Sequence, residues 1–173
     1  SNRCIGLGMK YKLGTIEKNN IEFIRTLRNN QMDILRQFKL INSVEQEEYF
    51  NKVHKDNTQI LFSILDNDSF IGYCGLTNIN YIYGTAEISF IVDTDDYENV
   101  FLFVLNELSK HAFNVLNLNK IWTETYEFRK NHINIIESFG MKQEGILREH
   151  VYKKGKRYNS IVHSLLKREY GTI

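Results

Sequence analysis

The sequence lacks proline and contains only two cysteines, Cys4 and Cys74, among its 173 residues. Two cysteines cannot build a disulfide framework, so the count indicates reduced thiols in a cytosolic protein. No apolar run approaches the roughly 20 residues of a membrane-spanning helix, and residues 1–8 lack the apolar core of a signal peptide. We therefore expect a cytoplasmic protein without a membrane span.

An excess of charge of one sign is also missing. The chain has 22 lysines and arginines against 21 aspartates and glutamates, so its formal net charge is +1. Proteins that bind nucleic acid usually carry a clear basic patch, and no basic run here exceeds a few residues. The spacing of the histidines does not indicate a metal pair. We expect neither a nucleic-acid partner nor a bound metal.

The length favours one domain with a core of its own. Residues 1–8 show no periodicity, and we interpret them as an N-terminal extension or a cloning remnant before Met9. The expected domain therefore covers residues 9–173.

The most informative stretch covers residues 85–113. In residues 85–92 (TAEISFIV) the side chains alternate with a period of two, which predicts a strand with Glu87 and Ile88 on opposite faces. Between residues 101 and 112 the apolar positions recur every three or four residues, which predicts an amphipathic helix. A strand that leads directly into a helix leaves the first helical N–H groups unpaired, and an anion can bind there.

The same reasoning places the other elements. We expect a first strand and the turn after it at residues 10–17, and further strands at residues 59–65, 70–76, 120–126, 143–152 and 157–166. We expect helices that begin at Asn19 or Asn20, at Ser43 in a capping box with Gln46, and at Asn131, with a further helical region at residues 32–38. The first helix should turn Ile21, Phe23, Ile24 and Leu27 inward, and the last should end at Gly140. Turns at residues 66–68 and 153–156 should close two hairpins. Strands interleaved with helices indicate the mixed α/β class.

Several short stretches, spread over nearly all of residues 10–170, match a known family in order and spacing. They are Leu27-Arg28-Asn29, Ile71-Gly72 with Gly75, Ala86-Glu87-Ile88, His111-Ala112-Phe113, residues 118–121 (LNKI) and residues 144–170 (EGILREHVYKKGKRYNSIVHSLLKREY). On these residues the chain resembles the GNAT superfamily of N-acetyltransferases. Within that superfamily it is most similar to the ribosomal-protein N-terminal and amino-sugar N-acetyltransferases.

The resemblance implies a twisted, mostly antiparallel sheet of about seven strands with four or five helices, in which strands 4 and 5 splay apart. It also implies that acetyl-CoA enters between these strands as co-substrate, with its pantetheine arm paired to a strand edge. The main chain implied for this pairing is that of Phe90, Ile91 and Val92. The pyrophosphate is expected on the amides of Asn99, Val100, Phe101 and Leu102, and Asn131 is expected to contribute a further contact.

The chain departs from the family pattern in the turn before that helix. The family has Gln or Arg, two residues, Gly, one residue, and Gly or Ala, because the backbone must approach the phosphates closely. Residues 93–100 (DTDDYENV) contain no glycine and carry four carboxylates, Asp93, Asp95, Asp96 and Glu98. Two interpretations are open. Either the acidic residues only stabilise the start of the helix, or a rearranged turn still presents amides to acetyl-CoA.

Acetyl transfer to an amine needs a base, a donor for the oxyanion and a proton for the departing thiolate. Glu87 matches the family's central-strand glutamate and is the expected base, and an ion-paired edge glutamate is the alternative. We expect an amide near Ile91 to face the oxyanion. The tyrosine that serves the family as acid falls on Ile136, which cannot donate a proton. Tyr126 and Tyr152 remain as candidates, and the favoured alternative for both is a ring packed on the core with its hydroxyl at the rim.

We therefore expect an acetyl-CoA-dependent N-acetyltransferase that acts by direct transfer on a primary amine. The acceptor is either a nucleotide-linked amino sugar or a protein N-terminus, and Arg28, Asn29 and Tyr152 are expected to contact it. One alternative is a non-catalytic protein of this fold that has lost acetyl-CoA binding and serves as an interaction module. Another is an enzyme with a different acyl donor. A homodimer through the last strands is expected only by analogy.

Overall fold

The computed structural model describes residues 10–172. These residues form two compact units. The first unit comprises the described residues up to Thr77 together with Ser89–Val104, and the second comprises Asn78–Ile88 together with the described residues from Leu105 onward. The expected N-terminal extension at residues 1–8, with Cys4, lies outside the described residues.

Seven strands hydrogen-bond in the order β1-β2-β3-β4-β5-β7-β6. β4 runs parallel to β5, and residues 85–87 pair with residues 120–122. The pairs β1–β2, β2–β3, β5–β7 and β6–β7 are antiparallel. The mixed α/β class and the mostly antiparallel seven-stranded sheet predicted from the sequence are therefore confirmed.

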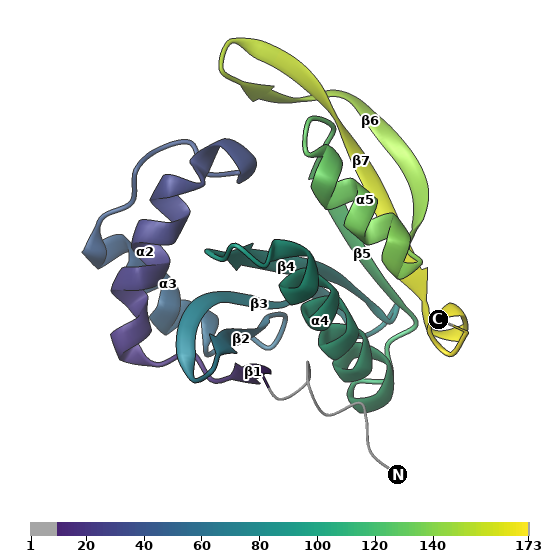
Figure 1. The fold of residues 1–173 in the computed structure, drawn as a ribbon, viewed down its shortest axis with the longest axis horizontal. Helices are drawn as coiled ribbons and strands as arrows, with labels where there is room; N and C mark the ends of the chain where they lie inside the picture. Colours follow the sequence, from purple (N-terminus) through teal and green to yellow (C-terminus); the bar gives the residue numbers. More distant parts are fainter. Residues whose placement is uncertain (1–9, 173) are drawn as a thin grey trace. The chain divides into compact units, whose positions relative to one another are not determined.

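The first unit places two helices beside three strands and the end of a fourth. Its elements are β1 (Tyr11–Gly14), η1 (Lys18–Asn20), α2 (Ile21–Asn30), η2 (Met32–Ile34), α3 (Ser43–Val53), β2 (Ile60–Asp66), most of β3 (Ser69–Asn80), the second half of β4 (Thr85–Val92) and the start of α4 (Tyr97–Lys110). Figure 1 shows α2 and α3 side by side. In the β2–β3 turn, Asn67 and Asp68 have positive φ angles of 45° and 68°. Asn and Asp tolerate this left-handed conformation, which a two-residue hairpin turn requires.

The core of the first unit confirms most of the predicted face of α2. Ile21, Ile24 and Leu27 are buried. The prediction for Phe23 was wrong, because its side chain is 39% exposed and meets the ring of Phe70 edge-on at 5.1 Å between centroids. Phe23 lies on the flank of the helix, where an aromatic ring can cover a neighbour without being enclosed.

α2 and α3 begin where the sequence indicated, but the caps of both helices and the length of a third differ from the prediction. The α3 capping box is formed by Asn42 and Glu45, not by Ser43 and Gln46, because the Asn42 side chain accepts from the Glu45 amide. Asn20 precedes α2 but makes no side-chain cap; its oxygen accepts from the Glu17 amide instead. Finally, the predicted helical region at residues 32–38 is limited to η2, since the backbone is already extended at residue 35.

The second unit contains the long C-terminal hairpin. Its elements are the first half of β4, the end of α4, the π-helical turn η3 (His111–Val115), β5 (Lys120–Tyr126), α5 (Lys130–Phe139), β6 (Lys142–Lys153), β7 (Lys156–Leu166) and α6 (Lys167–Tyr170). Figure 1 shows α5 beside the β6–β7 ribbon, and His163 of β7 contacts Glu137 of α5. α5 ends at Gly140, whose φ of 110° confirms the predicted glycine stop. The β6–β7 turn again uses two positive φ angles, at Lys154 and Gly155.

Candidate active site

Glu87 is the ionisable residue of β4. Its side chain is 7% exposed, and its Oε2 atom accepts a hydrogen bond from Asn78 Nδ2 at 2.7 Å. The alternative of an edge-facing glutamate does not fit this burial. Because a carboxylate loses hydration when it is buried, proteins seldom keep one without partners or a function. The amide of Asn78 fixes the direction in which this carboxylate points.

The end of β4 lies close to β3 in the first unit. A Cβ atom placed on Gly72 would lie 2.3 Å from the main-chain oxygen of Ile91 and 2.7 Å from the Cα of Val92. Only glycine permits this approach. The Val92 carbonyl oxygen also accepts from Gln31 Nε2 at 2.9 Å. One lone pair of the carbonyl that was expected to pair with pantetheine is thus already used.

Asp96 precedes α4 and fixes its first turn through side-chain and main-chain hydrogen bonds. Its carboxylate accepts from the Tyr11 hydroxyl and, at 2.8 Å, from Asn99 Nδ2. Its main-chain oxygen accepts from the Val100 amide at 3.1 Å, and its own amide donates to Thr94 Oγ1. The Tyr11 hydrogen bond lowers the pKa of the Asp96 carboxyl. For this residue the interpretation as a helix-stabilising acid fits the contacts.

The first helical turn therefore lies earlier than the sequence suggested. α4 begins at Tyr97, and the amides of Glu98 and Asn99 lie in its first turn, before the first main-chain hydrogen bond of the helix, from Val100 to Asp96. The Val100 amide bonds to Asp96 and is not available in this way, and the next two residues lie inside the helix. Of the expected amides from Asn99 to Leu102, only that of Asn99 precedes this bond. The reason is that the capping residue is Asp96, which no local pattern distinguished from its acidic neighbours.

The other three carboxylates of this turn face solvent. Asp93, Asp95 and Glu98 are all exposed. Repulsion between two unit charges about 4 Å apart is about 1 kcal/mol in bulk water, and salt screens it further. The acidic turn therefore weakens an anion site moderately and does not by itself abolish one.

An aromatic cluster that the sequence analysis missed joins β4 to α4. Phe90 stacks on Phe101 with 4.5 Å between ring centroids and 8° between ring planes. Tyr97 meets Phe90 edge-on at 5.5 Å. The signal was present as the four-residue spacing of Tyr97 and Phe101 on one helix. This packing holds the strand-to-helix turn where the family pattern uses glycines.

Arg28 and Asn29, the expected acceptor contacts of the first unit, have structural partners. Arg28 Nη1 donates to the Tyr73 hydroxyl at 2.6 Å. The Asn29 side chain accepts from the Ile41 amide and from Gln37 Nε2, and donates to the Ile41 carbonyl. Asn29 therefore fixes the loop that follows η2, which explains why no longer helix forms there.

The expected site residues of the second unit differ widely in exposure. Tyr126 is 8% exposed, and Lys153 Nζ lies 5.9 Å from its ring centroid. Tyr152 is 61% exposed, with the Arg157 guanidinium 5.3 Å from its ring. Asn131 is exposed in the first turn of α5. Ile136, at the family's tyrosine position, is fully buried and only packs.

Two histidines of the second unit are buried. His132 is 7% exposed, and burial, with a smaller contribution from the Arg129 charge, lowers its pKa to about 2. His163 is fully buried, and its Nε2 atom lies 3.0 Å from Glu137 Oε1. Within residues 10–172, no group of three or more His, Cys, Asp or Glu side chains is arranged to hold a metal ion. In the same residues, no helix is long and apolar enough to span a membrane.

Comparison with known proteins identifies the family. Residues 13–162 match the acetyltransferase (GNAT) domain. Spermidine N(1)-acetyltransferase of Vibrio cholerae is 29% identical over 153 residues, covering 86% of this chain and 88% of that protein. A crystal structure of spermidine N-acetyltransferase from Vibrio cholerae in complex with CoA and spermine has a TM-score of 0.87 at 25% identity, covering 94% of this chain and 99% of that one. A dodecameric structure of that enzyme has a TM-score of 0.83 at 25% identity, covering 94% and 97%. The chain belongs to the GNAT family of N-acetyltransferases, whose acyl donor is acetyl-CoA.

Proposed function

We propose that this chain transfers the acetyl group of acetyl-CoA directly to a primary amine, with Glu87 as the general base. The observation that carries this proposal is the buried Glu87 carboxylate on β4, held by Asn78 at 2.7 Å. A carboxylate shielded from water and aimed by a neutral donor is suited to accept the proton that an amine loses. Acetyl-CoA supplies the activated acetyl group.

The end of β4 and the start of α4 provide the groups proposed to hold the donor. β4 pairs with β5 only at residues 85–87, so the strand edge at Phe90 and Ile91 is proposed to offer main-chain atoms, and the first turn of α4 to offer the amides of Glu98 and Asn99. A helix N-terminus attracts anions through these amides and its dipole. In this chain the amides that would meet the pyrophosphate lie among solvent-exposed carboxylates. We therefore expect a lower affinity for acetyl-CoA than a glycine-rich turn would give.

For the acceptor, we propose a small aliphatic polyamine. Support comes from the Vibrio cholerae relative, which aligns over 88% of its length and is named for spermidine. The amino sugar and the protein N-terminus predicted from sequence remain the rival acceptors.

Three acceptors and a buffer control, tested in parallel, decide between these proposals. The purified protein is incubated with acetyl-CoA and spermidine, a nucleotide-linked amino sugar, an N-terminal peptide, or buffer alone. Thiol release is followed optically and the products by mass spectrometry. We expect acetylated spermidine as the main product. A preference for either rival acceptor would overturn the polyamine proposal and leave acetyl transfer intact.

The non-catalytic alternative has a specific structural argument in its favour. Gln31 occupies one lone pair of the Val92 carbonyl, and Asp96 caps α4 with its own contacts. Calorimetric titration with acetyl-CoA tests this alternative independently of the acceptor. No heat at millimolar ligand, together with no thiol release from any acceptor, would support an interaction module and overturn the proposed activity.

A further inference from the structure

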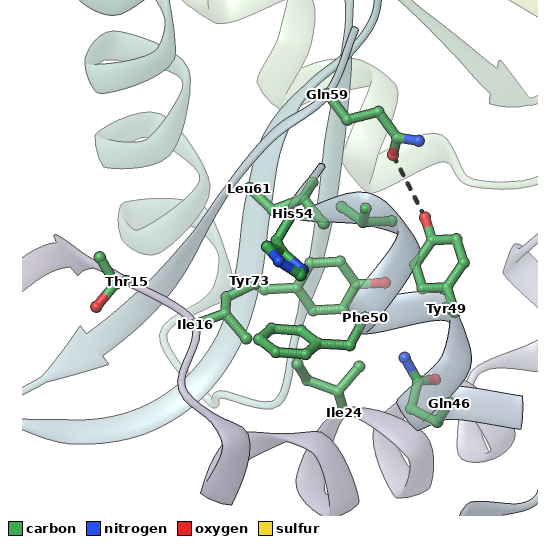
Figure 2. A pocket seen from close by; sticks show the side chains of 11 residues that line it. Thr15, Ile16, Ile24, Gln46, Tyr49, Phe50, His54, Gln59, Leu61 and Tyr73 are labelled. Atoms are coloured by element: carbon green, nitrogen blue, oxygen red, sulfur yellow. Dashed lines mark hydrogen bonds between the residues drawn. The ribbon is translucent and has the colours of Figure 1, made fainter. Parts of the chain in front are cut away.

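The cavity of the first unit is a poor place for an acceptor amine. It has a volume of about 220 Å³ and lies beside α2 and α3 (Figure 2). No Asp or Glu is among its lining residues. The groups that can carry charge there are the His54 imidazole in the lining and, next to it, the Arg28 guanidinium that donates to the Tyr73 hydroxyl. Both are positive when charged and would repel an ammonium group. The acceptor amine is therefore expected beside Glu87, in the second unit.

The neighbour of Glu87 in that unit is Asn78, which has an uncommon backbone conformation. Asn78 belongs to β3, but its φ angle is 47°, in the left-handed region that residues other than glycine seldom adopt. Conformations of this kind cluster at functional sites. Asn78 is exposed, whereas the Glu87 carboxylate that it contacts is buried. An exposed polar side chain is thus aimed at a buried acid, through a bond of 2.7 Å from Nδ2 to Oε2.

The amide of Asn78 has more hydrogen-bonding capacity than this contact uses. A primary amide carries two N–H donors and an oxygen that accepts. An ionised carboxylate only accepts, so Nδ2 must face Glu87 and Oδ1 is left for another donor. Within the described part of the chain, the side chain of Asn78 makes this one hydrogen bond. Because Oδ1 and Nδ2 share one carbon atom, a small group with two N–H bonds can reach both Oδ1 and the carboxylate.

We propose, on the basis of the proposed acetyl transfer, that Asn78 and Glu87 together bind the primary amine of the acceptor, with one N–H donated to each. In the transfer step the nitrogen lone pair forms the N–C bond to the acetyl carbon, and the C–S bond breaks with its electron pair on the CoA thiolate. The N–H that faces Glu87 gives its proton to the carboxylate. The N–H that faces Asn78 Oδ1 stays in the product amide.

This arrangement makes the site selective for primary amines. A secondary amine has a single N–H, so it can serve Glu87 or Asn78 but not both. A site built to bond an N–H rejects an analogue that lacks it, because the polar group of the site is left unpaired. With putrescine and its N,N′-dimethyl derivative as acceptors, we expect kcat/KM to favour putrescine about tenfold, the value of one hydrogen bond.

Two variants separate the oxygen of this amide from its nitrogen. Asn78→Gly keeps the left-handed backbone accessible and removes the side chain, so the preference for putrescine should disappear. Asn78→Asp keeps an oxygen acceptor but places a second carboxylate against Glu87. That variant should retain the preference, while the acidic limb of its pH–rate profile moves to higher pH, because like charges oppose ionisation. The matched control is Asn67→Gly, at another exposed asparagine with a φ of 45°, which should change neither property.

A binding measurement makes the test independent of turnover. The side-chain NH₂ signals of Asn78 in the isotope-labelled wild-type protein, assigned through bonds, are followed during titration with each of the two diamines. We expect putrescine to shift these signals at about tenfold lower concentration than its dimethyl derivative. Such shifts without turnover would refute the proposed acetyl transfer and leave the amine site standing.

The opposite result would overturn the site alone. Turnover with no shift of the Asn78 signals, or with an undiminished preference for putrescine in Asn78→Gly, would show that the amine is held elsewhere. If Asn78→Gly does not fold, the wild-type titration and Asn78→Asp decide. Equal concentrations of the two diamines in that titration, or a loss of the preference in Asn78→Asp, would contradict the role of the amide oxygen.

Discussion

The hydroxyl of Tyr11 on β1 donates a hydrogen bond to the carboxylate of Asp96, which lies 85 residues later in the chain. This bond joins the first strand of the described chain to the residue that caps α4. It explains why one acid of the turn is turned inward, while Asp93, Asp95 and Glu98 face solvent.

This bond predicts a pH-dependent contribution to stability. Because the Tyr11 bond lowers the folded-state pKa of Asp96, its contribution is fully present above the unfolded aspartate pKa of about 3.9. The contribution is lost as the pH falls through the lower folded value. Tyr11→Phe should therefore unfold at a lower urea concentration than wild type at pH 7, and the difference should shrink below pH ~4. A difference that is constant across pH would contradict the assignment.

For catalysis, we predict that Glu87→Gln lowers kcat about 100-fold, the lower range for loss of a general base. Acetyl-CoA affinity, measured by calorimetry, should stay near that of wild type, because the proposed donor contacts are main-chain atoms elsewhere. Glu47→Gln, at an exposed glutamate of α3, is the matched control and should retain full turnover. Unchanged turnover in Glu87→Gln would remove this residue from the mechanism.

Neutralising the acidic turn should strengthen donor binding. Asp95→Asn combined with Glu98→Gln removes two exposed charges and should tighten acetyl-CoA binding about fivefold at low salt. Since salt screens exposed charges, the gain should diminish as ionic strength rises. An equal affinity of wild type and variant at low salt would show that these side chains point away from the bound phosphates.

The close approach of β3 to β4 makes Gly72 intolerant of substitution. Gly72→Ala places a methyl group 2.3 Å from the Ile91 carbonyl oxygen, and overpacking of this kind costs about 1–3 kcal/mol. The matched control is Gly145→Ala on β6, where an added Cβ meets no atom within 4 Å. Urea unfolding should show a loss for the first variant and little change for the second. Equal stability of the two would contradict the described strand spacing.

Burial of His132 predicts a loss of stability in mild acid. Its folded-state pKa of about 2 lies below the unfolded value, so the unfolded chain binds the proton more readily. Stability should therefore fall by about 1.4 kcal/mol for each pH unit below ~6.5. His132→Leu should flatten the dependence between pH 6 and pH 4.5, as measured by urea unfolding. A slope that persists unchanged in that variant would point to another group.

Periodic patterns allowed much of the fold to be predicted. The strands at residues 85–92 and 120–126 were predicted with the bounds that the structure gives them. Both depend on local alternation, which reflects only which face of an element is covered. Cap positions were less reliable, because Asn42 and Ser43 are neighbours of similar chemistry and the choice between them depends on side-chain geometry.

The site was only partly predictable. Glu87 was found through family resemblance, but its burial and its Asn78 partner were not. Other features of the site are contacts between separate elements. They are the hydrogen bond of Gln31 to the Val92 carbonyl, the stacking of Phe90 on Phe101 and the hydrogen bonds of Asn29 to Ile41. No pattern within one segment encodes such a contact, because it requires the chain to be packed first.

The amino-acid sequence by itself determined the order of strands and helices, the class of the fold and the presence of an acidic, glycine-free turn, since each of these follows from neighbouring residues. Only the tertiary structure decided which acid caps α4, where the first turn of that helix begins, and which groups the Asn29 side chain binds. These features arise when distant side chains compete for the same space and the same hydrogen-bond partners, and that competition is resolved only in the packed molecule.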